Sequence, residues 1–240
     1  MNLAAGDFVL PVDKPVGPTS HDVVAAARRA LGTRRVGHTG TLDPFATGLL
    51  VLCIGRATRL AEYLSGMSKT YHATARLGVT TDTLDRAGSL MVERDASSVD
   101  EAEIRQVLAE LVGAIQQVPP QFSAKKVDGE AMYRRARRGE HVELPPVDVT
   151  IHEAELVSCD GLDVEFSVRC SSGTYIRSIA RDLGEALGVG AHLTELRRTS
   201  VGQYRIEDAV SMDELADENV VARARVAPIA AMAHLESITL

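Results

Sequence analysis

The 240-residue sequence contains no tryptophan, and aromatic residues make up only 4% of it. Its three cysteines, Cys53, Cys159 and Cys170, show no CxxC spacing. This pattern argues against a disulfide scaffold or a zinc site and is typical of a reducing compartment. We therefore expect a cytoplasmic protein without a metal. The longest apolar run, residues 49–54, is far shorter than the roughly 20 residues that cross a bilayer, so we expect no membrane contact.

Motifs that bind nucleotide cofactors are also missing. No G-x-G-x-x-G follows a predicted strand, and no G-x-x-x-x-G-K-[ST] occurs. We therefore expect no nucleotide cofactor. The N-terminus lacks the basic region of a signal peptide. With 45% apolar and 25% charged residues, the composition is that of a soluble globular protein able to build a core.

The charge is unevenly distributed. The net charge of −7 argues at face value against a nucleic-acid partner. Residues 14–59, however, contain seven Lys and Arg against two acidic residues, and residues 125–141 contain six against three. Residues 207–240 contain seven acidic residues against two arginines. Because polyanion binding depends on the local field, the basic segments fit either a nucleic-acid surface or solvated helix faces.

The hydrophobic pattern predicts strands and helices without regular βαβ alternation, which favours an α+β fold with a mixed sheet. An unbroken apolar run predicts a strand buried on both faces, and alternation predicts strands with one buried face. Residues 35–45 read as a loop. The predicted strands are 48–54, 70–77 and 162–170. The predicted helices are 20–31, 58–64, 100–111, 176–187 and 213–216. Ser20 is expected to cap the first helix, and Asp100 and Glu103 are expected to form a capping box at the start of the third.

Asp43 is the first candidate for chemistry. It ends a loop that contains two glycines, and Pro44 follows it just before the buried strand. A carboxylate there lies at the mouth of the core, and loops on a rigid sheet often carry catalytic groups. Asp-Pro is also a common turn pair, and His38 in the same loop can equally be structural. The spacing alone leaves both interpretations open.

Five blocks of sequence then occur in one order between residues 9 and 205. In this order they resemble the signature of the bacterial tRNA pseudouridine-55 synthases (TruB type). The blocks are Asp13-Lys14-Pro15 with Gly17–Ser20 and Gly37–Pro44; Lys69-Thr70-Tyr71 with Thr81-Asp82-Thr83; Pro119–Lys126; Ser172–Ser178 with Asp182-Leu183-Gly184; and His192-Leu193 through Leu196–Thr199.

The resemblance implies a pseudouridine-synthase-like α+β fold. Its mixed, largely antiparallel sheet is flanked by helices, and a basic lid is inserted at about residues 119–148. It also implies a cofactor-free isomerase that acts on the uridine at position 55 in the T-arm of tRNA. The base is flipped out, detached from its ribose, rotated and rejoined through carbon 5. The expected partner is tRNA alone, with a monomeric enzyme and no obligate protein partner.

The resemblance also assigns roles to single residues. Asp43 is the expected nucleophile, and attack at carbon 6 of the base or at carbon 1′ of the sugar both remain open. Arg177 is expected to pair with that carboxylate, which a bidentate guanidinium would keep charged and oriented. Tyr71 is expected to stack on the uracil and is a candidate for proton removal from carbon 5. The expected substrate-binding residues are His38 (which fills the space that the base leaves), Tyr175 and Leu196 (lining the pocket, although Leu196 could equally be core), Asp85, Lys14, Lys125, Arg134 and Arg137.

The sequence departs from the family pattern in two places. Phe122 stands where relatives often have tyrosine. Relatives usually continue into a small PUA-type RNA-binding domain. We therefore expect residues 1–207 to form the catalytic domain, and residues 208–240 to be an acidic tail that is a remnant or the start of such a domain.

Two other functions compete with the isomerase. The chain could be a tRNA-binding and folding module, which would not need Asp43 for catalysis. It could also be a hydrolase that uses His38 and Asp43, in which case free uracil would be released. An isomerase conserves the mass of its substrate.

Overall fold

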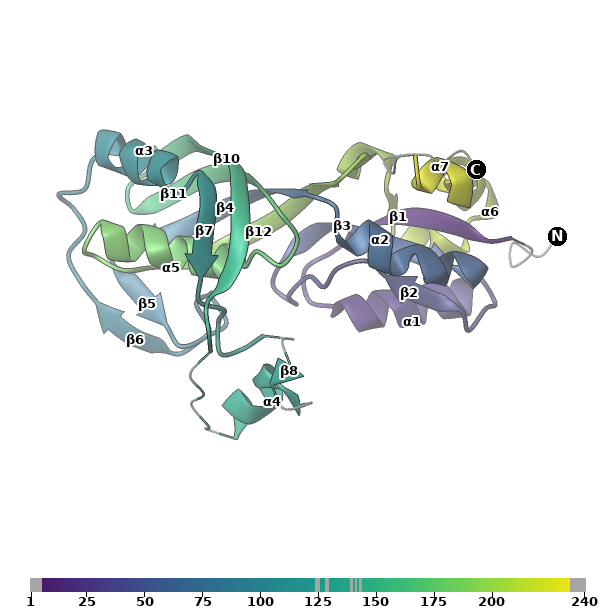
Figure 1. Cartoon of the computed structure of the whole chain (residues 1–240), viewed down its shortest axis with the longest axis horizontal. Coiled ribbons are helices and arrows are strands. Elements are labelled where there is room, and N and C mark those ends of the chain that lie inside the picture. Colours follow the sequence, from purple (N-terminus) through teal and green to yellow (C-terminus); the bar gives the residue numbers. More distant parts are fainter. Residues whose placement is uncertain are drawn as a thin grey trace. The chain divides into compact units, whose positions relative to one another are not determined.

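The computed structural model describes residues 6–123, 126–127, 130–138, 140, 142 and 144–233. The chain forms two compact units: unit 1 contains residues 1–71 and 197–240, and unit 2 contains residues 72–196 (Figure 1). The chain passes between the units inside two strands, β4 (Lys69–Leu77) and β12 (Ala191–Val201). Most strands pair antiparallel and helices accompany them, which confirms the expected α+β class with a mixed sheet.

Unit 1 is built around β3 (Thr47–Ile54), the continuous apolar run of the sequence. Because neighbouring residues of a strand point to opposite faces, this run fills two cores. Leu50 and Leu52 enter one core, whereas Leu49 and Val51 enter the other. The strand order is β14 (Val210–Ser211), β1 (Phe8–Lys14), β3 and β12, with β2 (Val36–His38) beside β3 and β13 (Tyr204–Arg205) beside β12.

Helices cover both faces of this part of the sheet. α1 (Ser20–Ala30), the 3₁₀ helix η3 (Asp213–Ala216) and α6 (Glu218–Ala224) contribute to the first core. The 3₁₀ helices η1 (Gly55–Leu60) and η2 (Ile206–Asp208), together with α2 (Ala61–Ser65) and α7 (Pro228–Ala231), contribute to the second.

Residues beyond 207 are therefore part of unit 1. Val210 and Leu215 are buried in the first core, and Ala231 is buried in the second. The compact units consequently do not coincide with the expected division into residues 1–207 and a tail of residues 208–240. Which residues make up the catalytic domain stays a prediction.

Unit 2 continues β12 and β4 with three further strands. In β4 every second residue from Tyr71 to Leu77 is buried, as the alternation predicts. α3 (Glu101–Glu110) packs against the sheet and against α5 (Ile176–Ala186), and the capping box of Asp100 and Glu103 is present. The order is β12, β4, β11 (Asp163–Cys170), β10 (Val147–Asp160) and β7 (Gly113–Gln117), with a separate ribbon of β5 (Val79–Thr81) and β6 (Leu90–Glu93).

The inserted segment of unit 2 contains a short strand pair and a helix. Its described elements are β8 (Lys126–Val127), β9 (Glu130–Ala131) and α4 (Met132–Arg137). β8 and β9 pair with each other, and α4 follows directly.

Two local predictions were wrong, and two predicted helices differ from the structure in helix type or starting point. Thr19, not Ser20, caps α1, because its side chain accepts from the Asp22 amide while the Asp22 carboxylate accepts from the Thr19 amide. Residues 36–38 of the predicted loop form the strand β2 by pairing with β3. Three residues are too few to show the alternation of apolar and polar residues that would predict a strand. Residues 213–216 form a 3₁₀ rather than an α-helix, and the predicted helix 58–64 begins as η1 before α2.

Among the described glycines of unit 1, Gly48 is the one at which an added Cβ atom would lie closest to another part of the backbone. Its φ is +101°, and a Cβ atom there would overlap the carbonyl oxygen of Arg198 and lie 2.8 Å from its nitrogen. We expect Gly48→Ala to lower the free energy of unfolding by roughly 2–4 kcal/mol, as measured by urea denaturation. Gly17→Ala is the matched control, since φ is +106° but nothing lies within 4 Å; it should cost about 1–2 kcal/mol. Equal losses would contradict the role of the close approach.

Candidate active site

Asp43 lies in unit 1, in the loop between β2 and β3, and is half-buried. The Ser20 hydroxyl donates to the Leu42 carbonyl oxygen (3.1 Å) and accepts from the Leu42 amide (2.8 Å). On the other side, the Ala46 amide donates to the Asp43 carbonyl oxygen at 3.1 Å. The backbone is thus hydrogen-bonded on both sides of the Asp43 side chain, and these bonds fix the position from which the carboxylate extends.

Lys14 is a buried cation near this loop. Its Nζ donates to the carbonyl oxygens of Pro15 (2.9 Å) and Pro18 (2.8 Å) and lies 3.5 Å from that of Pro44. Burial lowers the pKa of Lys14 from 10.5 to about 8, while attraction to the Asp43 carboxylate raises it. Near neutral pH the lysine therefore stays largely protonated and favours the ionised carboxylate. The expected part of Lys14 in substrate binding stays a prediction.

His38 ends β2 and is half-buried. Its ring meets that of His21 edge to face, with centroids 5.5 Å apart, and its Nδ1 accepts from the Gly40 amide at 3.3 Å. Burial, and after it the nearby His21, lowers the pKa of His38 below its usual 6.5. The imidazole is therefore neutral at pH 7, as an accepting Nδ1 requires.

Tyr71 lies on β4 in unit 1 and is 6% exposed. The Cζ atom of Arg198 lies 6.0 Å from the centroid of its ring, within the range at which an aromatic face attracts a guanidinium. Arg198 is on β12 and is itself fully buried.

Arg177 lies in unit 2, in the first turn of α5, and is buried. Nη1 donates to the Thr83 carbonyl oxygen and Nη2 to that of Phe122, each at 2.9 Å. The buried Asp85 carboxylate lies 3.5 Å from Nη1, so these two expected site residues are neighbours. Asp43 belongs to unit 1, and its pairing with Arg177 stays a prediction.

Tyr175 is the N-cap residue of α5 and has an extended backbone, with φ −99° and ψ 111°. The side chain of Gln117, fully buried at the end of β7, accepts from the Tyr175 amide at 2.8 Å and donates to its carbonyl oxygen at 3.1 Å. Leu196, on β12, is also buried. The roles of Tyr175 and Leu196 in lining a pocket stay predictions.

The basic insertion is described only in part. Lys125 lies outside the described residues, and Arg134 and Arg137 are placed on α4 by their backbone. Arg135 and Arg138 both pair with Glu140, at 3.0 and 2.8 Å.

Comparison with known families identifies the chain. The family model for the "TruB family pseudouridylate synthase (N terminal domain)" matches residues 28–176, more than half of the chain. The chain belongs to the TruB family. A second model, for the "tRNA pseudouridylate synthase B C-terminal domain", matches residues 177–236.

Two curated relatives of this TruB-family chain share one name. A protein of Thermobifida fusca named tRNA pseudouridine synthase B is 56% identical over 223 residues, which are 90% of this chain and 76% of the relative. A protein of the same name from Burkholderia mallei is 51% identical over 227 residues, which are 94% of this chain and 75% of the relative. The expected enzyme class, a pseudouridine synthase and thus an isomerase, is confirmed.

Solved structures confirm the expected fold. A chain in the crystal structure of a Cbf5-Nop10-Gar1 complex gives a TM-score of 0.76 at 32% identity over 98% of this chain. A chain in an H/ACA RNP bound to a substrate RNA containing 2'-deoxyuridine gives 0.72 at 31% identity over 95%. The TruB-family chain spans 64% and 61% of those two chains, less than two thirds of their length.

Three side chains form hydrogen bonds with the backbone at or beside the expected site residues, and none of the three was predicted to do so. Ser20 was assigned to a helix cap, because the sequence cannot distinguish it from Thr19. Gln117 carries no local signal, since its partner Tyr175 is 58 positions away. Arg198 stood in a recognised block, but its neighbours along the chain do not show that it turns into the core.

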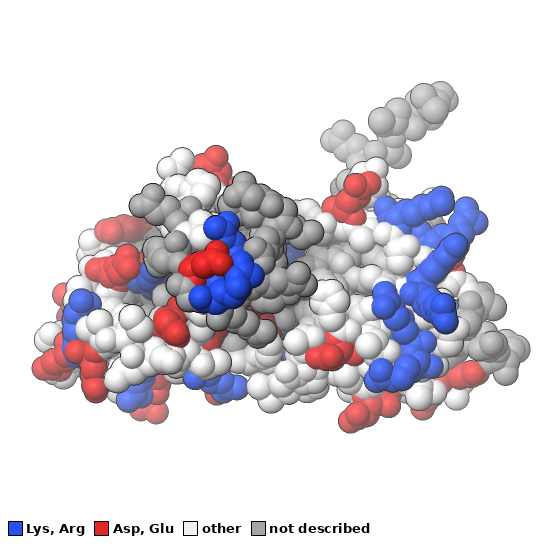
Figure 2. Space-filling model, turned by 90° about the horizontal axis from the view of Figure 1, so that it is seen from below, with Lys and Arg blue, Asp and Glu red and all other residues white. Residues whose placement is uncertain are grey.

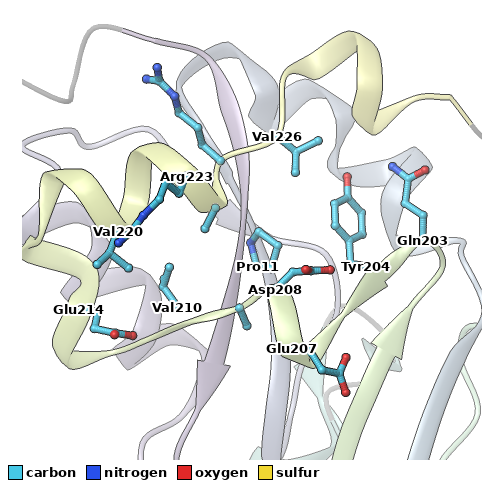
Figure 3. Close-up of a pocket in the computed structure, with 13 residues that line it drawn as sticks. Pro11, Gln203, Tyr204, Glu207, Asp208, Val210, Glu214, Val220, Arg223 and Val226 are labelled. Atoms are coloured by element: carbon cyan, nitrogen blue, oxygen red, sulfur yellow. The ribbon is translucent and has the colours of Figure 1, made fainter.

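Unit 1 contains a cavity of about 640 Å³. It is lined by Pro11 of β1 and by side chains of the segment 203–226, and Figure 3 shows the carboxylates of Glu207, Asp208 and Glu214 around it. None of the expected site residues lines it, so it is not the candidate active site.

Basic side chains gather on the surface of unit 1. Figure 2 shows a group of Lys and Arg side chains there. A cluster of this kind attracts polyanions whatever the net charge of the chain. The exposed arginines of α1, of the turn before β2 and of η1 are Arg28, Arg29, Arg34, Arg35, Arg56 and Arg59, here called the arginine patch.

No helix in the described part of the chain is long and apolar enough to cross a membrane. Within the same residues, no group of three or more His, Cys, Asp or Glu side chains is arranged to hold a metal ion.

Proposed function

We propose that this chain converts the uridine at position 55, in the T-arm of tRNA, to pseudouridine. The relatives named tRNA pseudouridine synthase B support tRNA as the substrate, and the resemblance to the pseudouridine-55 family supports the position. The observation that carries the proposal is Asp43 itself. Its loop is bonded on both sides, and a buried lysine favours its ionised form.

The reaction is an isomerisation within one nucleotide. The bond from carbon 1′ to N1 breaks, a bond from carbon 1′ to carbon 5 forms, carbon 5 loses a proton and N1 gains one. The Asp43 carboxylate serves as the nucleophile that adds and later leaves, at carbon 6 or at carbon 1′. The base must first leave its stack, which costs a few kcal/mol that protein contacts offset.

The buried aromatic side chain of Tyr71 suits an extruded base, since a ring face replaces the stacking that the base has lost. Tyr175 and Leu196 line the same pocket in this proposal, and Tyr71 is the candidate for removing the proton from carbon 5. The neutral ring of His38 fills the space that the base leaves, where an uncharged ring costs less than an imidazolium.

Arg177 is proposed to hold Asp43 in its ionised form. Its contacts with Thr83, Phe122 and Asp85 fix the direction of its guanidinium. A fork held in this way presents its N–H groups to a carboxylate in one geometry. Asp85 compensates the buried positive charge, which explains a second acidic residue close to the site.

Binding of tRNA is assigned to two basic surfaces. The insertion, with Lys125, Arg134 and Arg137, closes over the T-arm in this proposal, and the arginine patch attracts more distant phosphates. Both contribute a sequence-independent affinity that falls as salt rises. We further propose that the enzyme acts as a monomer in the cytoplasm; size-exclusion chromatography with light scattering tests the first point.

Incubation with an unmodified tRNA transcript tests the function. Chemical labelling and primer extension should locate one pseudouridine, at position 55. Release of free uracil would instead support the hydrolase. Tight tRNA binding without any pseudouridine would support the folding module.

The proposed contact between the insertion and tRNA can be tested by removing the positive charges of the insertion. We expect replacement of Arg134, Arg135, Arg137 and Arg138 by glutamine to raise the KM for tRNA about 10-fold and to flatten the salt dependence of binding by up to about 3 units of the log–log slope. Equilibrium binding at several salt concentrations measures both.

A matched control removes arginines from the sheet and from α3 of the same unit. Arg76, Arg105 and Arg169 are paired with Asp163, Glu101 and Glu153, at 2.8, 3.1 and 2.7 Å. Replacing these three by glutamine should leave the slope unchanged. An unchanged slope in the insertion variant would mean that the insertion does not touch RNA.

A further inference from the structure

Arg198 is, with Lys14, among the largest side chains that the described residues bury completely. A buried guanidinium is costly unless its N–H groups are bonded. Nε donates to the Leu49 carbonyl oxygen at 2.7 Å and Nη2 to that of Gly40 at 3.1 Å, while Nη1 lies 3.5 Å from that of Thr41. Its fork thus joins residues on both sides of Asp43 along the chain.

The backbone of Arg198 is fixed at the same loop. β12 runs parallel to β3 and pairs Arg198 with Gly48. The approach is so close that a side chain at position 48 would overlap the Arg198 carbonyl oxygen. The side chain therefore starts from the end of the Asp43 loop and reaches back to its beginning at Gly40.

The same guanidinium also lies over the ring of Tyr71, with its Cζ atom 6.0 Å from the ring centroid. Its charge acts on the surroundings of the loop as well, since Arg198 contributes to lowering the pKa of both Lys14 and His38. One buried cation therefore links the loop of the proposed nucleophile to the ring proposed to stack on the uracil.

We propose that Arg198 is a positioning residue of the isomerisation, which holds the Asp43 loop and the Tyr71 ring in one arrangement without touching the uridine. This inference rests on the proposed role of Asp43. A lysine would keep the charge but could not bond carbonyl oxygens on both sides of the loop, because an ammonium is a compact point charge without a planar fork. Loss of the fork would misplace the carboxylate from the reacting atom, and a shift of about 1 Å can cost 100-fold in rate.

The test compares Arg198→Lys with the neighbouring Arg197→Lys. Arg197 also lies on β12, but it is half-exposed and pairs with Asp13 at 2.8 Å. For Arg198→Lys we expect a single-turnover rate about 100-fold below that of the wild type, with tRNA affinity within a few-fold. The Arg197→Lys rate should stay within a few-fold. Thermal melting of both variants shows whether they are folded.

The possible outcomes distinguish a positioning role of Arg198 in the reaction from a purely structural role. A near-normal rate for Arg198→Lys, or a raised KM with an unchanged kcat, overturns the proposal. If Arg198→Lys has no cooperative melting transition, Arg198→Gln replaces it, and the same fall in kcat at unchanged affinity is required. Failure of both variants to fold would show a structural role only. The proposed function is judged separately, by whether the wild type forms pseudouridine at all.

Discussion

Replacement of Asp43 by asparagine is expected to lower pseudouridine formation by at least about 10,000-fold, the scale on which loss of a covalent nucleophile acts. Asparagine has the same shape, so the bonds of Ser20 to Leu42 and of Ala46 to the residue-43 carbonyl oxygen can persist. The neutral amide, however, cannot add and leave as a carboxylate does. Binding of tRNA should therefore stay within a few-fold, since the phosphate contacts are made elsewhere.

Asp13→Asn is the matched control for this variant. Asp13 is a carboxylate of the same unit that pairs with Arg197 at 2.8 Å, and its loss should leave turnover within a few-fold. Tritium release from tRNA labelled at carbon 5 of uridine measures both rates, and filter binding measures affinity. Pseudouridine formed by Asp43→Asn at a normal rate would refute the nucleophile. Equal losses of binding and rate would show that Asp43 acts through tRNA binding rather than as the nucleophile.

Elements with a long, clear period were predictable from the sequence. The apolar run of β3, the alternation of β4 and β11 and the capping box of α3 each carry their signal within a few residues. Short elements were not, because β2 has three residues and exists through its pairing with β3. Likewise, only packing on β1 and α1 shows that Val210 and Leu215 belong to the first core of unit 1.

In the candidate site, too, some residues could be predicted from the sequence and others could not. Asp43 and Arg177 could be named because each stands in a distinctive block of sequence. The groups that hold them could not. Arg198 reaches Gly40 across 158 positions, and Arg177 reaches Thr83 across 94. Side chains that bond backbone carbonyl oxygens leave no pattern of residue types, since every residue has a carbonyl group.

Arg177→Lys is expected to slow turnover at least about 100-fold, although the charge is retained. The guanidinium spans the carbonyl oxygens of Thr83 and Phe122, both at 2.9 Å, with Asp85 at 3.5 Å. A lysine ammonium cannot reach both carbonyl groups, and one left without a donor costs about 1–3 kcal/mol. In the proposed mechanism the same change removes the forked contact that orients the nucleophile.

The neighbouring Arg181, one turn later in α5, separates these effects. It is partly exposed and bonds Asp182 at 2.7 Å and the Val118 carbonyl oxygen at 3.2 Å. Arg181→Lys should therefore keep turnover within a few-fold. Single-turnover rates and melting temperatures are compared for both variants. A slow but stably folded Arg177→Lys would show that the fork acts in the reaction, because the charge and the fold are then both retained. Near-normal turnover would remove the argument for pairing with Asp43, and a loss of rate that only follows a loss of stability would reduce Arg177 to a support of its own unit.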